Sequence, residues 1–156
     1  MKTTLLVLVL NEIESITFTL PQIQKDWVEE IIVVDGGSND GTVEWCKDHD
    51  YTVIQQEKPG YGQGVREAAR VATGDILIEY MPDGNCDASA IPRLIQKINE
   101  GYDLVIASRY LDGAKSFDDT WYTRLGNWSF TQLVNLLFGA SYTDALMGYR
   151  AYRKDV

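Results

Sequence analysis

Short apolar runs alternate with amphipathic stretches along most of the chain. The apolar runs cover residues 5–10, 30–35, 51–55, 76–80 and 103–108. Runs of this length, bounded by polar and turn-forming residues, are typical of buried parallel strands. The stretches between them carry apolar side chains at helical spacing, in residues 14–25, 42–46, 65–72 and 91–100. This alternation predicts an α/β fold with a mostly parallel sheet, right-handed crossovers and helices on both faces.

The pattern changes after residue 109. Residues 112–120 form a polar stretch around Gly113, which we interpret as a mobile loop. Residues 121–138 are rich in aromatic and leucine side chains, and the default interpretation is an apolar helix that closes the core. The alternative is a helix that lies at a lipid interface, which its aromatic residues suit. Arg124 is the only clear cation of this stretch, which weakens the membrane interpretation.

Length, charge and cysteine content narrow the class of protein. A chain of 156 residues has room for a core of its own, and we predict a single domain over residues 1–156. The net charge of −9 argues against nucleic acid as a partner, because like charges repel. Cys46 and Cys86 lack metal-ligand or CxxC spacing, which indicates free thiols in a reducing, cytoplasmic compartment. No apolar run approaches the roughly 20 residues that span a bilayer, so we predict no transmembrane segment.

Polar residues follow the carboxyl ends of four predicted strands. They are Asn11 with Glu12, Asp35, Asp83 with Asn85, and Ser108 with Arg109. In a doubly wound sheet these ends share one rim, where ligands bind near a switch in strand order. Carboxylates, glycines and an arginine on one rim therefore predict a binding site.

Two loops on this rim suit a nucleotide. Asp35, which Gly37 follows closely, is able to accept an N–H of a base, although a turn residue that bonds its own backbone is the alternative. The loop at residues 58–64 contains Gly62, and its glycines would let the backbone approach an anion at a helix N-terminus. This loop matches neither the Walker motif nor the dinucleotide fingerprint.

Oxygen ligands after the fourth predicted strand suit a divalent metal. Asp83 and Asn85 would supply a partial shell for magnesium or manganese, with Asp87 in reserve. The alternative is an ordinary turn, in which these side chains bond nearby backbone groups.

The arginines and the single histidine limit which other kinds of catalytic or binding site the chain can form. Arg109, Arg124 and Arg150 suit a bidentate grip on phosphates, and surface ion pairs are the alternative for each of them. His49 lies between two aspartates at a predicted helix end. Ser–His–Asp, Cys–His and zinc sites therefore all lack parts.

Six ordered segments carry a family resemblance that extends over nearly the whole chain. They are residues 10–15, 31–42, 58–64, 72–75, 107–110 and 144–152. Together they resemble the family-two glycosyltransferases of the glycosyltransferase A fold, which is Rossmann-like. The last two resemble the branch that contains the polyprenyl-phosphate (dolichol-phosphate type) sugar synthases.

The resemblance implies a role for most of the rim residues. It implies a nucleotide-binding part over about residues 1–108 and an acceptor-side part over about 109–156. The residues implied to bind the nucleoside-diphosphate sugar donor are Leu10, Asn11, Glu12, Asp35, Gly37, Gly62 and Arg150. Asp83 and Asn85 would hold the metal, and Arg109 and Arg124 would face the phosphate of a lipid-phosphate acceptor. Such an acceptor implies a cytoplasmic protein that works peripherally at a membrane surface.

Two positions depart from the family pattern. The family often has Asp-X-Asp after the fourth strand, and this chain has Met81 at the place of the first aspartate. Gly36 replaces the second aspartate after strand two. A thioether is a poor ligand for a hard cation, so the departure at Met81 predicts weak metal affinity or a dispensable metal.

The implied mechanism is inverting sugar transfer. A lipid phosphate is already ionised at neutral pH, so the protein would act by orientation and charge neutralisation, without a general base. A hydroxyl acceptor would need a carboxylate base, for which Asp144 is the candidate. The variant Asp144→Asn is therefore predicted to spare a phosphate acceptor.

Two other classes of protein compete with this interpretation. A nucleotide-sugar-binding protein without catalysis is one, and Met81 favours it. A receiver-like signalling domain is the other, but it needs an acidic pair after the first strand and a lysine after the fifth. This chain has Asn11-Glu12 and Ser108-Arg109 there, so the receiver interpretation ranks lower.

Overall fold

The computed structural model describes residues 1–111, 114 and 120–156. Apart from Ala114 and Thr120, the predicted polar loop at residues 112–120 lies outside the described residues.

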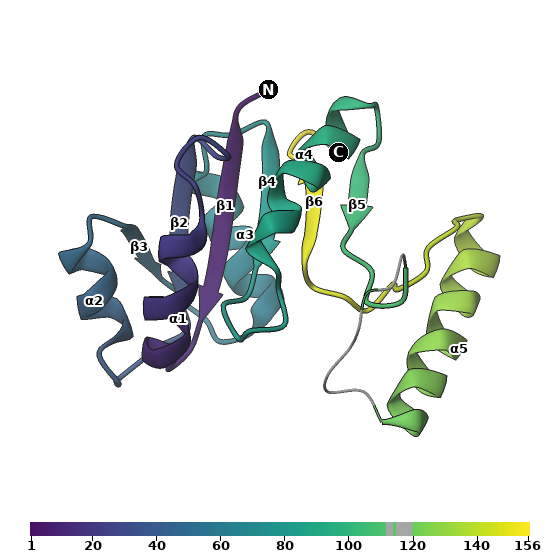
Figure 1. The fold of residues 1–156 in the computed structure, drawn as a ribbon, viewed down its shortest axis with the longest axis horizontal. Coiled ribbons are helices and arrows are strands. Elements are labelled where there is room, and N and C mark those ends of the chain that lie inside the picture. The colour runs from purple at the N-terminus through teal and green to yellow at the C-terminus, as the bar shows by residue number, and fades with distance from the viewer. Residues whose placement is uncertain (112–113, 115–119) are drawn as a thin grey trace.

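Six strands form one sheet in the order β3-β2-β1-β4-β6-β5 (Figure 1). Their bounds are β1 Thr3–Val9, β2 Glu30–Asp35, β3 Thr52–Gln55, β4 Ile76–Tyr80, β5 Leu104–Ile106 and β6 Arg150–Arg153. β1 pairs in parallel with β2 and β4, and β2 pairs in parallel with β3. β6 lies antiparallel between β4 and β5, so the sheet is mostly parallel, as predicted. β6 itself was not predicted, because its four residues include two arginines and show no apolar run.

Helices cover both faces of the sheet. Their bounds are α1 Ile13–Thr19, α2 Thr42–Asp48, α3 Tyr61–Val71, α4 Ile91–Asn99 and α5 Trp121–Phe138, with short 3-10 turns η1 Leu20–Gln22 and η2 Ala88–Ala90. α1, α2 and α4 pack on one face, and α3 covers the other (Figure 1). The helix predicted at residues 14–25 ends at Thr19, because Pro21 lies in η1 and cannot continue the ladder. α3 begins earlier than the predicted residue 65, so Gly62 lies in its first turn rather than in a loop.

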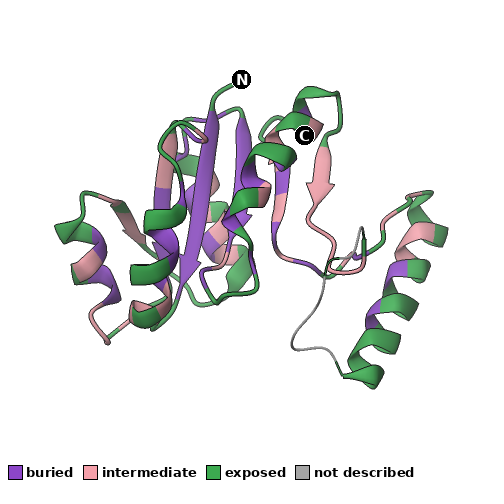
Figure 2. Ribbon diagram, viewed as in Figure 1, coloured by how far each residue is buried: buried purple, intermediate pink, exposed green. Residues whose placement is uncertain are grey.

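The core is built by strands that are buried on both sides. In β1, Leu5, Val7 and Val9 pack toward α1 and α4, whereas Leu6 and Leu8 pack toward α3. Every residue of β1 and β4 is buried (Figure 2). Each fully buried aliphatic side chain contributes roughly 1.5–3 kcal/mol, so this part of the sheet fixes the carboxyl ends of the strands rigidly.

α5 does not close the core, and the default prediction for residues 121–138 was wrong. Large apolar side chains along this helix are exposed, among them Trp121 and Phe138 at 79% each and Leu136 at 81%. Its two buried residues are Asn127 and Thr131, which are polar. The helix stands at the β5 edge, apart from the helices that cover the sheet (Figures 1 and 2). None of the described helices combines the length and apolar character that crossing a bilayer requires.

Candidate functional site

A cavity of about 350 Å³ opens at the carboxyl ends of β1, β2 and β4. We call it the smaller cavity. Leu10, Glu12 and Asp83 line it together with Gly36, Gln56 and residues 59–61. It lies where the strand order reverses between β1 and β4, the position at which open α/β sheets bind ligands. The sequence therefore predicted the position of this cavity and three of the residues around it.

The turns beneath the smaller cavity are held by Asp35 and Asn11. The carboxylate of Asp35 is fully buried and accepts hydrogen bonds from the backbone N–H groups of Gly37 at 3.0 Å and Ser38 at 3.1 Å. Asn11, with a positive φ of 56°, accepts the N–H of Asn39 at 2.9 Å. Neither Asp35 nor Asn11 lines the cavity. The contacts of Asp35 are therefore those of a turn residue that bonds its own backbone, the alternative interpretation from the sequence.

The start of α1 fixes the backbone of Glu12. Its N–H donates to Oγ1 of Thr42 at 3.0 Å, and the N–H of Ile13 donates to Oδ2 of Asp40 at 3.0 Å. The Thr42 hydroxyl in turn donates to Asp40 at 2.6 Å, a hydrogen bond that lowers the pKa of Asp40. A carboxylate therefore stays ionised below the α1 N-terminus, and the Glu12 side chain is left to line the smaller cavity.

A larger cavity of about 880 Å³ lies beside the first. Its walls are residues 83–87, part of α4, the end of β5 and residues 147–149, and its polar side chains include Asp83, Asn85 and Arg109. Met81 and Asp83 line both cavities, so the two spaces meet at these residues. The predicted metal loop therefore stands at the junction of the two cavities.

The junction offers few metal ligands. Oδ1 of Asp83 accepts the backbone N–H of Asn85 at 3.0 Å, and Oδ1 of Asp87 accepts that of Ser89 at 2.9 Å, which are ordinary turn contacts. Among the described residues, no three His, Cys, Asp or Glu side chains gather to hold a metal. The thioether of Met81 packs against Gly148, where an added Cβ would lie only 2.8 Å from Met81 Cε. Asp83 with Asn85 therefore fits a metal only as a partial shell.

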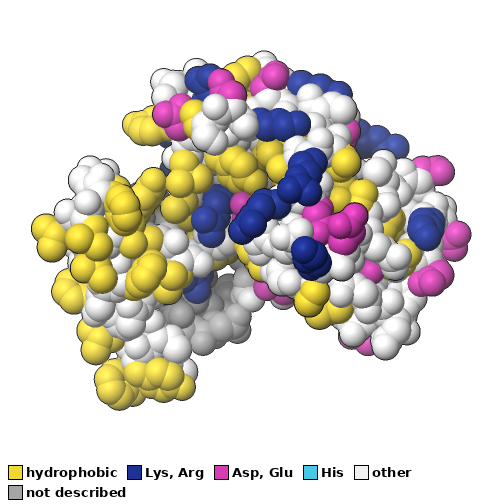
Figure 3. All heavy atoms as spheres, turned by 180° about the vertical axis from the view of Figure 1, so that it is seen from behind, with side chains coloured by type: hydrophobic (Ala, Val, Ile, Leu, Met, Phe, Trp, Pro, Cys, Tyr) yellow, Lys and Arg dark blue, Asp and Glu magenta, His cyan; other side chains and the backbone are white. Residues whose placement is uncertain are grey.

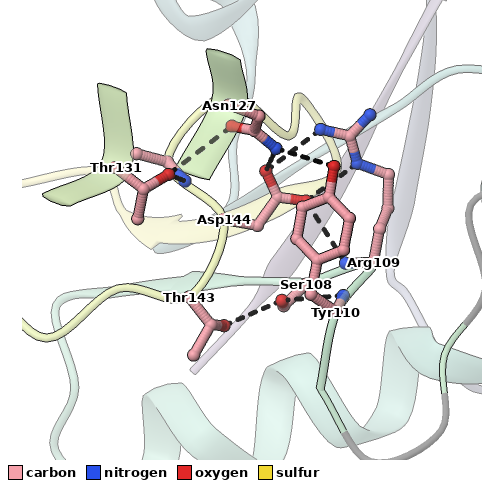
Figure 4. Close-up of polar contacts among 8 residues, drawn as sticks. Ser108, Arg109, Tyr110, Asn127, Thr131, Thr143 and Asp144 are labelled. Carbon is pink, nitrogen blue, oxygen red and sulfur yellow. Dashed lines mark hydrogen bonds and ion pairs between the residues drawn. The ribbon is translucent and has the colours of Figure 1, made fainter. Parts of the chain in front are cut away.

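Arg109, which is partly exposed, forms an ion pair with the buried Asp144 beside the larger cavity (Figure 4). Nε and Nη2 of Arg109 donate to the two carboxylate oxygens of Asp144 at 2.8 and 3.1 Å, and the Arg109 backbone N–H donates at 3.2 Å. Asn127 donates a fourth hydrogen bond to Asp144 at 2.8 Å. Burial raises the pKa of Asp144, but the bonds from Arg109 and Asn127 outweigh it and hold that pKa below its ordinary value.

This geometry does not suit Asp144 as a general base. Its four accepted hydrogen bonds match the about four lone-pair sites of a carboxylate. Asp144 lines neither cavity. The prediction that Asp144→Asn would spare a phosphate acceptor also loses its basis, because the substitution would replace the ion-pair partner of Arg109 with a neutral amide.

Two predicted phosphate-binding arginines, Arg109 and Arg124, both contact the ring of Tyr110. The guanidinium carbon of Arg109 is 5.4 Å from the ring centroid, and that of Arg124, from the first turn of α5, is 5.6 Å away. Cation–π contacts of this kind hold a guanidinium over an aromatic face. Arg109 and Arg124, which are distant in sequence, thus gather beside the larger cavity, whose lining includes Arg109 alone of the two.

Sequence reasoning missed a polar cluster around Glu79 in β4. This buried carboxylate accepts a hydrogen bond from the hydroxyl of Tyr61 and lies 3.7 Å from Nε of Arg150. Burial and the Glu79 carboxylate raise the pKa values of Tyr61 and Tyr152. Arg150 therefore faces Glu79 and lines neither cavity. A charged residue within the apolar run of residues 76–80 was the signal that pointed to this cluster.

The two cysteines are free thiols, as predicted. Cys46 and Cys86 are both buried. Burial raises the pKa of Cys86 to about 12, which makes it an inert part of the wall of the larger cavity.

Comparisons with known proteins agree with this architecture. The chain is 32% identical to a dolichyl-phosphate hexose transferase of Haloferax volcanii, with 94% of this chain and 64% of the relative covered. It is 33% identical to an undecaprenyl-phosphate mannosyltransferase of Micrococcus luteus, with 93% and 63% covered. The chain thus spans less than two thirds of the length of these relatives.

A solved structure shares the fold. Glucosyl-3-phosphoglycerate synthase of Mycobacterium tuberculosis, in complex with Mn²⁺, uridine diphosphate and glucosyl-3-phosphoglycerate, superposes with a TM-score of 0.74 at 22% identity. The likeness covers 99% of this chain and 57% of that one. The sequence model of one family matches residues 4–156, and the chain belongs to glycosyl transferase family 2.

Proposed function

We propose that this chain catalyses transfer of a sugar from a nucleoside-diphosphate sugar to a polyprenyl phosphate. The observation that carries the proposal is the junction of the two cavities at Met81 and Asp83. A donor whose diphosphate lies at this junction would present its sugar to the larger cavity, where Arg109 is located. Family membership and the lipid-phosphate acceptors in the names of two relatives support the same reaction.

The donor nucleotide would occupy the smaller cavity. Leu10 and Glu12 are the predicted base contacts that line it. Asp35, with Gly37 at a φ of 105°, would act through the turn that it holds rather than by direct contact. Gly62 lies in the first turn of α3, whose N-cap residue Gly60 makes no side-chain cap, and a helix N-terminus favours an anionic diphosphate.

A divalent metal would be held at the junction by Asp83 and Asn85. Both residues are exposed, and magnesium commonly takes one or two carboxylates together with waters and substrate phosphates. When bound, the metal would neutralise the charge that develops on the departing diphosphate. With Met81 in place of a carboxylate, we propose weaker metal binding than a two-aspartate site would have.

The acceptor phosphate would bind at the Arg109 end of the larger cavity. Arg109, Arg93 and Lys97 line this cavity together with apolar side chains such as Leu94 and Val105. A cavity lined by both cationic and apolar side chains suits a phosphate attached to a hydrocarbon. Arg124, which also lies over the ring of Tyr110, would bind the same phosphate from α5.

The chemistry would then need no proton transfer. An oxygen of the acceptor phosphate attacks the anomeric carbon while the bond to the diphosphate breaks, and the leaving nucleoside diphosphate takes the electron pair. Arg109 would orient the attacking phosphate, since Asp144 fixes one edge of its guanidinium. Inversion follows because the attack and the departure occur on opposite faces of the sugar.

The acceptor would bring the protein to a membrane surface. Apolar side chains of α5 such as Trp128 and Leu133 are exposed. In the view from behind, hydrophobic side chains gather on the lobe that α5 forms (Figure 3). Such a surface supports peripheral contact with lipid. We therefore place the proposed reaction at the cytoplasmic face of a membrane, although the net charge of −9 favours a weakly charged lipid surface over an anionic one.

Transfer of labelled sugar from a panel of nucleoside-diphosphate sugars to farnesyl phosphate, with manganese present, tests the proposal. We expect Arg109→Ala to lower kcat/KM for the acceptor by about 100-fold, on the scale of losing one charge-stabilising donor. Lys47→Ala, on the exposed side of α2, is the matched control and should keep full activity. Absence of nucleoside diphosphate binding across the panel would overturn the proposal.

Met81 favours a second candidate function, a nucleotide-sugar-binding protein without catalysis. Its thioether occupies the junction, where a metal-binding carboxylate would serve catalysis. The same panel separates the two functions. Calorimetric binding of a nucleoside diphosphate, with neither transfer nor slow hydrolysis of the sugar, would favour the binding protein.

A further inference from the structure

α5 is attached to the rest of the chain by polar side chains four residues apart. Asn135 exchanges two hydrogen bonds of 2.8 Å with the backbone of Tyr142. Thr131 accepts the backbone N–H of Ala145 at 3.1 Å, and Asn127 lies one turn further toward the start of the helix. Because the apolar side of this helix is exposed, these hydrogen bonds fix its position.

Of these three polar residues of α5, Asn127 is the one that contacts the Asp144–Arg109 pair (Figure 4). Its Nδ2 donates to Oδ1 of Asp144 at 2.8 Å and to the hydroxyl of Tyr110 at 3.0 Å, so both amide hydrogens are used. The same Asp144 carboxylate accepts the hydrogen bonds from Nε and Nη2 of Arg109, the latter on the same oxygen as Asn127. A single amide therefore connects α5 to the carboxylate that orients Arg109.

Burial makes this connection stiff. Asn127 is 5% exposed and Asp144 is 1% exposed, so water cannot easily replace a lost hydrogen bond between them. In such surroundings hydrogen bonds are strong, and an unpaired polar group is costly. Movement of α5 away from residues 142–145 would withdraw Asn127 and remove one of the four hydrogen bonds that fix the Asp144 carboxylate, which in turn orients Arg109.

We propose that Asn127 is a positioning residue, which couples the docking of α5 to the orientation of Arg109 by fixing the Asp144 carboxylate. This inference deepens the proposed function, since it rests on Arg109 as the group that meets the acceptor phosphate. Asn127 touches no substrate and acts through two other side chains. α5 therefore has to be docked for the acceptor side to be complete.

Hydrogen exchange of the Arg109 Nε–H, measured by NMR without any substrate, tests the coupling directly. In Asn127→Ala we expect exchange about tenfold faster than in the wild type, the scale of losing one hydrogen bond to a charged group. Gln132→Ala removes an exposed amide from the same helix and should leave the exchange unchanged. Tyr110→Phe removes the other partner of Asn127 and should also change it little.

Binding of farnesyl phosphate, with farnesol as the uncharged control, provides the functional measurement. Asn127→Ala should weaken the binding of farnesyl phosphate about tenfold and leave the binding of nucleoside diphosphate unchanged. In an Arg109→Ala background the same substitution should have no further effect on farnesyl phosphate. A merely structural role would add its loss in both backgrounds.

The outcomes separate this inference from the proposed function. Unchanged Arg109 exchange in Asn127→Ala, with farnesyl phosphate bound as by the wild type, would overturn the coupling and leave the acceptor assignment intact. Faster exchange in Asn127→Ala, with no farnesyl phosphate bound even by the wild type, would support the coupling and overturn the acceptor assignment. If Tyr110→Phe accelerates exchange as much as Asn127→Ala does, the connection through Asp144 is wrong.

Discussion

The central sheet and α5 are held in place by opposite kinds of contact. β1 and β4 are buried throughout, between apolar side chains of α1, α4 and α3. α5 turns its apolar residues outward and attaches through Asn127, Thr131 and Asn135. The first arrangement fixes the proposed donor side by packing. The second makes the proposed acceptor side depend on a few hydrogen bonds, which solvent, lipid or a charge change can affect more easily.

The largest contrast should appear between apolar truncations in the two regions. Ile78→Ala removes a fully buried side chain of β4 and should lower the free energy of unfolding by about 2–5 kcal/mol, because a cavity replaces packed atoms. Urea denaturation monitored by circular dichroism measures the change. Ile78→Val, with only one methylene removed, should cost about 0.5–1.5 kcal/mol.

A smaller loss should follow from Asp144→Asn, because it leaves Arg109 with a neutral partner. We expect about 1–3 kcal/mol at pH 7, the range for an unsatisfied buried polar group. The contribution should depend on pH. The pKa of Asp144 is lowered in the folded state, so its stabilisation is complete above the unfolded pKa of about 3.9 and disappears as pH falls through the folded pKa.

Urea denaturation repeated between pH 7 and pH 3 checks this dependence. The wild type should lose more stability than Asp144→Asn as the pH falls below about 3.9, so the two curves should approach each other toward pH 3. Parallel curves over the whole range would contradict the assignment of this carboxylate as an ion-pair partner in the folded state.

The smallest effect should come from the exposed face of α5. Leu136→Ala changes a side chain that is 81% exposed, so the free energy of unfolding should change by at most about 0.5 kcal/mol. The same denaturation measurement applies, with Ile78→Ala as the internal reference. A loss as large as that of Ile78→Ala would mean that the apolar face of α5 is packed in solution, and would contradict the difference between α5 and the central sheet.

The fold followed from the sequence where local pattern and burial agree. The predicted bounds of β2, β4 and α5 match the structure, since apolar runs and helical spacing end sharply at turn residues there. β6 could not be predicted from the sequence, because its residues gain strand structure only by pairing with β4 and β5. The exposure of the apolar face of α5 could not be predicted either, since spacing indicates which residues share a face and not whether other residues cover that face.

The sequence predicted where the site lies, at the carboxyl ends of the strands, better than it predicted which groups each side chain contacts. Glu12, Asp83 and Arg109 line the cavities, because each lies in the loop that follows the carboxyl end of β1, β4 or β5. Asp35 and Asp144 instead bond to backbone or to neighbouring side chains, which only coordinates reveal. The roles of Arg124, Arg150 and Gly62, the metal at Asp83 and Asn85, and the division near residue 108 stay predictions.

The place of β6 in the sheet has a consequence for the order of assembly during synthesis. β5 has β6 as its strand neighbour in the sheet, so residues 104–106 cannot join the parallel strands before residues 150–153 have emerged. The half of the sheet that would bind a nucleotide is free to form earlier, since β1 to β4 pair among themselves. A ribosome paused between these two stretches would therefore carry β1 to β4 already paired, beside residues 104–106 that still lack their strand partner.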